Sequence, residues 1–558
     1  MKNHAALCLL LGFIVSLFVM LLPNSVLAQD EPFFANTPFS KDSVVRQKCS
    51  VCHKLNEQNK VEVIEETRKT PEEWQAVISR MRRINGAPIT DEDFHQCIKE
   101  LSQHLMLTPD EMSEVAYINT LGVQGLNSQF REVPQGETEE RIFTACVRCH
   151  TYGKIRSHKK TAHQWEENMV MHLGYYPTVV PQMREMDWPK EAMELVDILA
   201  ERDAFDTPEW REWMKNRSQQ DLSGTWIIAG YQPGMGYYHG SYTIKPNPEE
   251  GEDEYFIEKS IQYDNGMNIN TSGQGTLFGE YHLRYTLAPT ALFGKIKGVF
   301  DLEAAQKTFQ GTWWTAIQDN NAYGKERFVK KDNQSKLFAN YPGSLQSNGQ
   351  ASHLTLIGTN IPQNLTPQDI SFTSEDVQVL DVQVSGSTIL CKVEASSQAA
   401  IQTTDITING MSGTRSVNLY DQINKIQIYP RLGRARVSCG AAYPPEGVQF
   451  VARGIHFGKD GQLDTEDDVL LEPVDAKWSL EEEVTRENDD DLEYLKAPVV
   501  NGLYTPVTTY APIQSRDQNR EGVGLIAITA NYSPENGVLL KDRALLAVTE
   551  TDFIPQIK

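Results

Sequence analysis

The chain has 558 residues and a formal net charge of −23, from 52 basic and 75 acidic side chains. This length predicts several domains, each with a core of its own. The negative charge disfavours nucleic acid and anionic membrane surfaces as partners, and it favours a positively charged patch on a partner protein.

The N-terminus has the pattern of a secretory signal peptide. Lys2 precedes an apolar run from Ala5 to Leu22, and the small residue Ala28 stands just before Gln29. This pattern predicts cleavage after residue 28, and the alternative is an uncleaved membrane span. No later stretch of the sequence has the apolar length to cross a bilayer, so we expect an exported chain without a membrane anchor.

The motif Cys-x-x-Cys-His occurs twice, at residues 49–53 and 146–150. Its two cysteines form thioethers to the vinyl groups of haem c, and its histidine binds the iron as an axial ligand. One copy alone is also compatible with zinc or a disulfide, but two copies in an exported chain predict two covalent haems and electron transfer. Because such haems are attached outside the bacterial cytoplasm, we expect a periplasmic protein. The predicted attachment residues are Cys49, Cys52, Cys146 and Cys149, with His53 and His150 as axial ligands.

An imperfect repeat follows each motif. The sequence Lys-Thr-Pro-Glu-Glu-Trp at 69–74 corresponds to Lys-Thr-Ala-His-Gln-Trp at 160–165. In both copies a threonine with Glu or Gln three residues later predicts a helix start, with the tryptophan in the first turn. Seven residues beyond the tryptophan, on the same helix face, stand Met81 and His172. Both are suitable sixth ligands, and their matching positions predict that each binds an iron.

Other side chains compete for these two roles. The alternatives to Met81 are Met106, Met112, His95 and His104, and those near His172 are Met169, Met171, His158, His163 and Met183. Met81 could also be an ordinary core methionine. If both assignments hold, one haem is His/Met and the other His/His. Methionine favours reduced iron, so the two potentials should differ and give electron flow a direction.

From Asp221 onward the pattern becomes short alternating strands separated by Gly and Asn turns. Gly-Thr-Trp occurs at 224–226 and again at 311–313, and a polar break at 330–335 ends this block. Further strand patterns predict two sandwiches, with the acidic stretch 481–491 as a solvated loop. The fold class we expect is multidomain, α followed by all-β. Its parts are a signal peptide at 1–28, a helical dihaem cytochrome c domain at 29–219, an antiparallel β-barrel at 220–335, and immunoglobulin-like β-sandwiches at 336–428 and 429–558.

Three cysteines remain once the haem and signal-peptide cysteines are set aside. They are Cys97, Cys391 and Cys439. A disulfide between Cys391 and Cys439, which both lie in strand-like stretches, and three unpaired buried cysteines are equally compatible with the sequence. The segment from Asp460 to Asp468 has calcium-loop character but lacks the full EF-hand pattern, so an acidic turn is the main alternative to a calcium site.

No catalytic constellation is apparent in the β half, which lacks a Gly-x-Ser-x-Gly elbow, a His-Glu-x-x-His motif and a phosphate loop. These domains are therefore expected to serve as scaffold or docking surface.

Taken in order, these elements resemble the alpha (dihaem) subunit of quinohemoprotein amine dehydrogenase over essentially the whole chain. The most specific stretches are 171–177 after the second haem motif, 80–88 after the first, and 223–226 at the start of the barrel. The resemblance implies a small partner subunit whose cysteine tryptophylquinone oxidises primary amines, and a β-propeller subunit that completes a heterotrimer. It further implies that this chain passes electrons from the quinone, through its haems, to a soluble cupredoxin or cytochrome c. No amine-oxidising residue is then expected here.

Two other functions are compatible with two haem motifs. A stand-alone dihaem electron carrier would leave the long β half unexplained. A dihaem peroxidase needs one iron with an open sixth position, which the paired Met81 and His172 would not provide.

Overall fold

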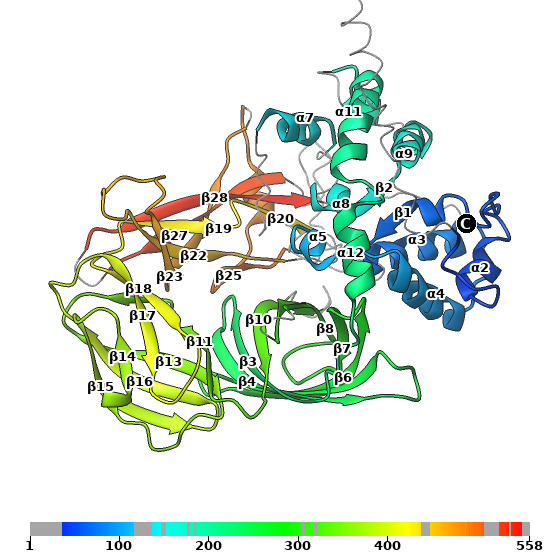
Figure 1. Ribbon diagram of the computed structural model, residues 1–558. Helices are drawn as coiled ribbons and strands as arrows, with labels where there is room; N and C mark the ends of the chain where they lie inside the picture. The colour runs from blue at the N-terminus through cyan, green and yellow to red at the C-terminus, as the bar shows by residue number, and fades with distance from the viewer. Residues whose placement is uncertain are drawn as a thin grey trace, which may run out of the picture.

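The computed structural model describes residues 36–115, 136–146, 152–175, 179–182, 186–303, 307–315, 322–436, 447–485, 487–506, 524–534 and 537–549. Figure 1 shows the helical N-terminal region above a β-barrel, with two further β domains beside them. Within the described residues no helix has the length and apolar character needed to cross a membrane. The predicted signal peptide, 1–28, lies outside the described residues.

The helical region is built from two similar units. In each unit a short helix ends at the first cysteine of the haem motif and a second helix begins after the Lys-Thr repeat. A third helix then packs against the second. The first unit contains α2 (Val44–Cys49), α3 (Pro71–Arg83) and α4 (Asp91–His104), and the second contains α7 (Glu137–Cys146), α9 (Ala162–Tyr175) and α11 (Trp188–Arg202). The remaining short elements are η1 (Ile64–Glu66), α5 (Pro109–Ser113), α8 (Tyr152–Arg156), α10 (Val179–Gln182) and α12 (Pro208–Asn216).

The caps expected from the repeat form in both units. The Thr70 side chain accepts a hydrogen bond from the Glu73 backbone N–H, and Thr161 does the same for Gln164. Each cap satisfies a backbone donor that the first turn leaves without a helical partner. The indoles of Trp74 and Trp165 then donate to backbone carbonyls at the ends of α4 and α11. The repeat in the sequence therefore corresponds to a repeat in the packing.

A two-stranded antiparallel sheet joins the units. It pairs β1 (Thr67–Lys69) with β2 (His158–Lys160), so that Thr67 lies opposite Lys160 and Lys69 opposite His158. Each strand precedes the second helix of its own unit, α3 or α9. The sheet therefore holds the starts of α3 and α9 next to each other.

The barrel is closed and has eight antiparallel strands in chain order, with β10 returning to β3. Both Gly-Thr-Trp copies place a buried tryptophan in it, Trp226 and Trp313. A Cβ on Gly311 would lie 1.9 Å from the Val299 carbonyl oxygen, so only glycine fits there. The strands are β3 (Gly224–Gln232), β4 (Gly236–Pro246), β5 (Glu254–Tyr263), β6 (Asn268–Phe278), β7 (His282–Leu287), β8 (Ile296–Glu303), β9 (Thr308–Thr315) and β10 (Tyr323–Lys330).

The next domain is a sandwich of two four-stranded sheets, β11-β13-β16-β15 and β12-β18-β17-β14. Its inward-facing side chains alternate along the strands, as in β16, and form one apolar core that includes Cys391. The strands are β11 (Lys336–Tyr341), β12 (Ser344–Gln346), β13 (Ala351–Thr359), β14 (Ile370–Phe372), β15 (Val377–Ser385), β16 (Thr388–Ala395), β17 (Gln402–Ile408) and β18 (Arg415–Tyr420), with η3 (Pro367–Asp369) between β13 and β14.

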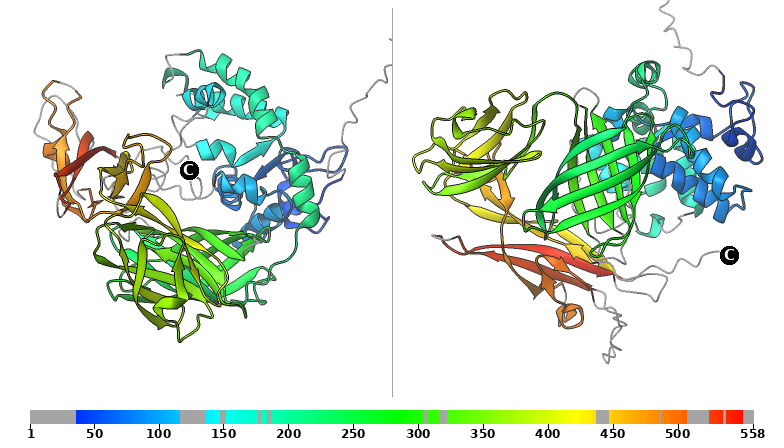
Figure 2. Two further views of the ribbon diagram at one scale, coloured as in Figure 1. Left: turned by 60° about the vertical axis from the view of Figure 1, so that its left-hand side comes forward. Right: turned by 90° about the horizontal axis from the view of Figure 1, so that it is seen from below.

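The last domain has one four-stranded sheet, β20-β28-β27-β24, and two three-stranded sheets, β19-β22-β23 and β21-β26-β25. Its elements are β19 (Lys425–Tyr429), β20 (Leu432–Arg436), β21 (Val448–Gln449), β22 (Val451–His456), β23 (Val469–Pro473), β24 (Lys477–Glu482), α13 (Asp491–Leu495), β25 (Val499–Val500), β26 (Leu503–Tyr504), β27 (Gly524–Tyr532) and β28 (Leu540–Thr549). The predicted fold class is confirmed, as the views in Figure 2 show.

One expectation about this last domain is wrong. The acidic stretch 481–491 is not entirely a solvated loop, because its two ends belong to β24 and α13. Asp491 is buried and accepts a hydrogen bond from the Leu525 backbone N–H at 2.8 Å. A carboxylate that satisfies a backbone donor can be buried in this way, and the charge pattern alone did not indicate it.

A buried charge cluster connects the first helical unit to the barrel. His282, at the start of β7, contacts Asp301 Oδ1 through Nδ1 at 2.5 Å and Glu72 Oε1 through Nε2 at 3.0 Å. Arg284 also pairs with Glu72, which lies in the first turn of α3. Burial by itself lowers the pKa of His282, but the negative charges of Asp301 and Glu72 outweigh it and raise that pKa to about 9. His282 is therefore charged at neutral pH.

This cluster predicts a pH-dependent stability. Because the folded pKa lies above the ordinary value of 6.5, the stabilisation by charged His282 is complete below pH 6.5 and is lost as the pH rises through about 9. Its size is at most about 3 kcal/mol. Thermal unfolding between pH 6 and 9.5 should show a steeper loss of Tm for the unsubstituted protein than for His282→Gln. His456→Gln, which removes a histidine with a largely exposed partner, Asp421, should keep the unsubstituted slope. Equal slopes for the unsubstituted protein and His282→Gln would contradict the prediction.

Candidate functional site

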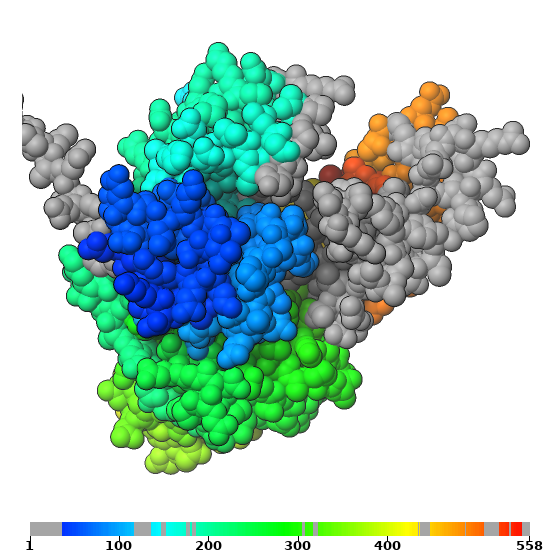
Figure 3. Space-filling view, turned by 90° about the vertical axis from the view of Figure 1, so that its right-hand side faces the viewer, coloured from blue at the N-terminus to red at the C-terminus, as the bar shows by residue number. Residues whose placement is uncertain are grey.

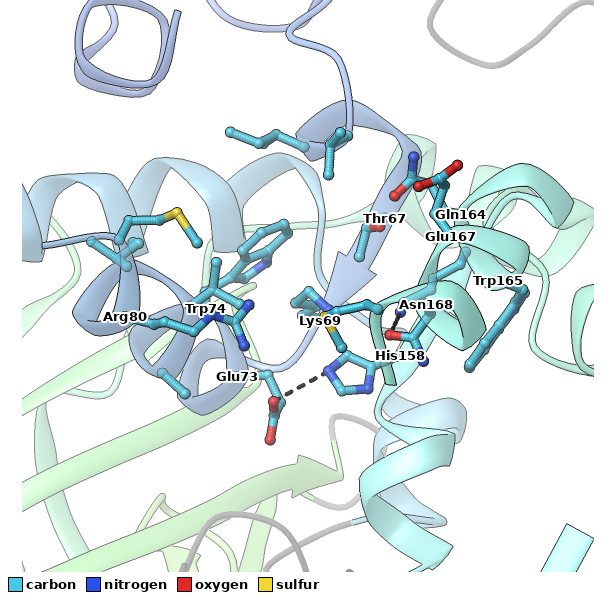
Figure 4. Close-up of a pocket in the computed structure, with 18 of the residues that line it drawn as sticks. Thr67, Lys69, Glu73, Trp74, Arg80, His158, Gln164, Trp165, Glu167 and Asn168 are labelled. Carbon is cyan, nitrogen blue, oxygen red and sulfur yellow. Dashed lines mark hydrogen bonds and ion pairs between the residues drawn. The ribbon is translucent and has the colours of Figure 1, made fainter. Parts of the chain in front are cut away.

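A cavity of ≈ 850 Å³ lies between the two helical units. Residues of α3 and β1 line it from the first unit, and residues of α9 and β2 line it from the second (Figure 4). Its size is within the range of about 300–1,000 Å³ that is usual for cofactor sites. Figure 3 shows the first unit (blue) directly above the barrel (green) and the second unit (cyan) above the first.

The first haem motif borders this cavity. Helix α2 ends at Cys49, and the His53 backbone N–H donates to the Cys49 carbonyl at 2.9 Å, which continues the turn through the motif. As a result Cys49, Cys52 and His53 all line the cavity. Burial lowers the pKa of His53, which favours the neutral imidazole that a metal requires.

Met81 lines the same cavity from α3, two turns beyond Trp74. Its sulfur accepts a hydrogen bond from Asn85 Nδ2 at 3.3 Å. After the helix, Gly86 adopts a positive φ of 66°, and the Ala87 N–H then returns to the Met81 carbonyl at 2.9 Å. The chain therefore folds back within six residues of Met81, and this bond fixes the end of the helix that carries it.

The competitors of Met81 lie elsewhere. Met106 and Met112 are buried in the core that the helical region shares with the barrel. His95 and His104 are on α4, where His104 packs edge-on against Phe39, and neither borders the cavity. Met81 is thus the candidate that the structure brings to the cavity with His53, and its ligand role stays a prediction.

In the second unit, Cys146 ends α7 and borders the cavity, as does His172 on α9. The Nδ1 atom of His172 lies 2.7 Å from the Asn168 carbonyl oxygen. A donor at Nδ1 leaves the Nε2 lone pair for a metal. His158, His163, Met169 and Met171 also line the cavity, so several candidate ligands meet there. Cys149, His150 and Met183 lie outside the described residues.

Three family profiles match the chain. "Quinohemoprotein amine dehydrogenase A, alpha subunit, haem binding" matches residues 39–210, "alpha subunit domain II" matches 219–328, and "alpha subunit domain IV" matches 426–557. The chain belongs to the quinohemoprotein amine dehydrogenase alpha subunit family. It is therefore a subunit of an amine dehydrogenase, an oxidoreductase, and its helical region is a haem-binding domain. An alpha subunit also implies partner subunits.

Solved structures resemble the alpha subunit chain only weakly. The redesigned β-barrel mFAP1 bound to DFHBI is 16% identical, with 20% of this chain and 94% of that chain covered and a TM-score of 0.18. Protocadherin gamma C5 EC1-3 is 9% identical, with 43% and 76% covered and a TM-score of 0.15. Domains 4–9 of the surface layer protein SbsC are 11% identical, with 58% and 47% covered and a TM-score of 0.15. No curated protein matches the chain.

The donors of the alpha subunit's cavity fit covalently bound haem. Thiols from both units, imidazoles from both units and the thioether of Met81 border one space, whose walls include Trp74 and Trp165. Thiols for the porphyrin vinyl groups, nitrogen or sulfur for iron, and flat apolar walls are the groups that haem c needs.

Sequence reasoning missed several residues of this cavity. Lys69, Lys160 and Glu73 were seen only as parts of the repeat, yet all three line the cavity. Glu73 is ion-paired with Lys154 and lies 3.2 Å from His158 Nε2. One feature of the sequence could have indicated Lys69 and Lys160. Both copies of the repeat have a lysine directly before the capping threonine, although the helix cap does not require a lysine there.

The other cysteines divide between the domains. Cys97 on α4 is fully buried in the core of the first helical unit, where its thiol hydrogen-bonds that of Cys49, and it does not line the cavity. Cys391 is a buried free thiol in the sandwich core, and Cys439 lies outside the described residues. The structure therefore does not contain the Cys391–Cys439 disulfide that one reading of the sequence favoured.

The acidic loop from Asp460 to Asp468 uses its carboxylates internally. Asp467 accepts from the backbone N–H groups of Lys459 and Asp460, and Asp468 accepts from that of Asp464. Among the described residues, three carboxylates within reach of one ion occur at 489–491 and not in this loop. These bonds are typical of an acidic turn, and the calcium site stays a prediction that the geometry does not favour.

Proposed function

We propose that this alpha subunit is the dihaem electron relay of a periplasmic amine dehydrogenase. It takes electrons from a cysteine tryptophylquinone on a small partner subunit, where primary amines are oxidatively deaminated. It passes them through two haems to a soluble cupredoxin or cytochrome c, and a β-propeller subunit completes the heterotrimer. The observation that carries the proposal is the cavity to which both helical units contribute haem-motif cysteines and candidate iron ligands.

Different residues would hold each of the two haems. Cys49 and Cys52 anchor one haem, and Cys146 and Cys149 anchor the other. His53 and Met81 would hold the iron in the first unit, and His150 and His172 would hold it in the second. When bound, haem supplies a reversible one-electron iron couple. The chain's own part is to orient each imidazole, as the Asn168 carbonyl does for His172, and to keep water out with Trp74 and Trp165.

The β domains serve as scaffold and docking surface in this proposal. The barrel supports the first haem unit through the Glu72–His282 contact, and no amine-activating group is assigned to this chain. Amine chemistry therefore belongs to the partner subunit, and this chain accounts for electron delivery.

A reconstitution experiment tests the proposal. The purified holo-chain, mixed with amine and an external acceptor, should show haem reduction no faster than the buffer background. Addition of the small quinone subunit and the propeller subunit should give amine-dependent haem reduction. The change in haem absorbance measures this reduction. Both haems should be low-spin and inactive with hydrogen peroxide. Mass spectrometry of the periplasmic fraction should show a chain that starts at Gln29 and carries two haem masses.

Each alternative has its own outcome. Amine-dependent reduction of the isolated chain would place the oxidising group here and overturn the division of labour. A high-spin haem with peroxide turnover would indicate a peroxidase. Reduction that is unaffected by the partner subunits would indicate a stand-alone carrier.

A further inference from the structure

The two faces of the β1-β2 sheet carry different basic side chains. Side chains of a strand alternate between faces. Thr67, Lys69, His158 and Lys160 line the cavity, whereas Arg68 and Lys159, which lie opposite each other in register, do not. The sheet thus presents one pair of cations to the rear and another pair to the cavity.

The rear cations are neutralised within the chain. Arg68 makes two hydrogen bonds to the carboxylate of Glu111, at 2.6 and 2.9 Å. Lys159 Nζ lies 2.6 Å from Asp203 Oδ1. Both cations are buried, and each has the carboxylate partner that a buried charge requires.

The cavity-facing cations have no such partner. Lys69 and Lys160 are 8% and 7% exposed. Lys160 Nζ donates to the neutral amide oxygen of Asn168 at 2.7 Å, and among the described residues no carboxylate lies within ion-pair distance of Lys69 or Lys160. Their other contacts are with aromatic faces, since Lys69 lies 5.8 Å from the Trp74 ring and Lys160 lies 4.8 Å from the Trp165 ring.

The only buried carboxylate that borders the cavity in the described structure, Glu73, is already engaged by Lys154 and His158. Among the described residues, five lysine or arginine side chains and two glutamates line the cavity, in a chain whose net charge is −23. Burial lowers the pKa of Lys160 to about 7 and that of Lys69 well below its ordinary value. An anion that enters the cavity would restore both charges.

The two lysines hold equivalent positions. Each directly precedes the capping threonine of its repeat. Each backbone N–H also donates at 3.0 Å to the carbonyl of the C-cap residue that follows the third helix of its unit, Leu105 or Asp203. Two equivalent sites for an anion therefore accompany two equivalent haem units.

We propose that Lys69 and Lys160 are positioning residues that each pair with a propionate carboxylate of a bound haem. This inference rests on the proposed function, because the propionates are the anions that two haems would bring into the cavity. The pairing holds the porphyrin edge at the sheet between the units, and it places a fixed positive charge beside each carboxylate.

The test is the haem potential in the complete complex. Lys69→Met and Lys160→Met should each keep two haem masses, since the thioethers are elsewhere, but lower one midpoint potential. A nearby cation favours electron uptake, and a tenfold loss in the reduction constant corresponds to about 59 mV for one electron. Between pH 5 and 9 the affected potential should also become more pH-dependent, because an unpaired propionate takes up a proton more readily on reduction.

Two kinds of variant serve as controls. Lys69→Arg and Lys160→Arg keep the charge and should restore both the potential and its pH profile. Lys190→Met removes one charge from an exposed site on α11 and should change neither. If a Met variant folds poorly, Lys→Gln at the same position gives the neutral comparison.

The outcomes distinguish a failure of the lysine–propionate pairing from a failure of the proposed function. Unchanged potentials and pH profiles in both neutral variants would overturn the proposed pairing of the lysines with propionates. A lowered potential that arginine does not restore would assign a structural role to the lysine and would also overturn it. Absence of covalent haem from the unsubstituted protein would instead overturn the proposed function.

Discussion

Replacement of both cysteines of one haem motif is expected to abolish electron delivery to the external acceptor. In Cys49→Ala/Cys52→Ala no thioether can form in the first unit, and in Cys146→Ala/Cys149→Ala none can form in the second. Reduction of the quinone by amine should continue in the assembled complex, because that step belongs to the partner subunit. Mass spectrometry should show one haem mass in each variant, and steady-state assays with the acceptor should fall to background.

The matched control is Cys391→Ala. It also removes a buried thiol, but from the core of the sandwich and not from the haem cavity. It should therefore keep two haem masses and full electron delivery. If a chain with one haem delivers electrons at the original rate, the two haems do not act in series. The proposal that electrons pass through both haems would then be wrong.

Substitution of the two predicted sixth ligands should have different spectroscopic effects. Met81→Ala should remove the weak long-wavelength band of methionine–iron ligation and lower one potential, since thioether sulfur favours reduced iron. His172→Ala should keep that band and open the other iron to carbon monoxide. Absorption spectra of the oxidised and carbon-monoxide-treated reduced protein, with a redox titration, measure both effects.

Two further variants control for side effects. Met193→Ala on the surface of α11 should leave the spectra unchanged, because Met193 does not border the cavity. His163→Ala tests the histidine competitor on α9, which also lines the cavity, and should leave the predicted ligands in place. Retention of the long-wavelength band in Met81→Ala would assign the sixth position of the first haem to another residue, although two covalent haems would remain.

Local features of the fold could be predicted from the sequence because their causes are local. Thr70 and Thr161 form the expected helix caps, and the alternating strands after Asp221 form the barrel. The repeat was visible because both units need the same cap and the same tryptophan. Spacing alone placed Met81 and His172 on the face that borders the cavity.

Other assignments depended on contacts between distant segments. Met106 and Met112 were sequence competitors of Met81, but their burial at the barrel excludes them from the cavity. Asp491 lies in an acidic run, yet its carboxylate is buried against β27. Neither outcome follows from residue type or spacing, because the partners lie far away in the chain.

The haem motifs, the helix starts and the alternating strands could be read from the sequence, since they depend on covalent chemistry, capping and local periodicity. The pairing of charges could not, because it depends on the packing of distant segments. Arg68 and Lys69 are adjacent in the chain, but the pleat of β1 turns one toward Glu111 and the other toward the cavity. Likewise, Glu72 and Glu73 are neighbours, but Glu72 pairs with the barrel and Glu73 pairs with the second helical unit. An unpaired buried charge is costly, so each buried charge needs a partner of opposite sign or a polar contact. The packing of distant segments, and not the neighbouring residues in the chain, determines which partner each charge has.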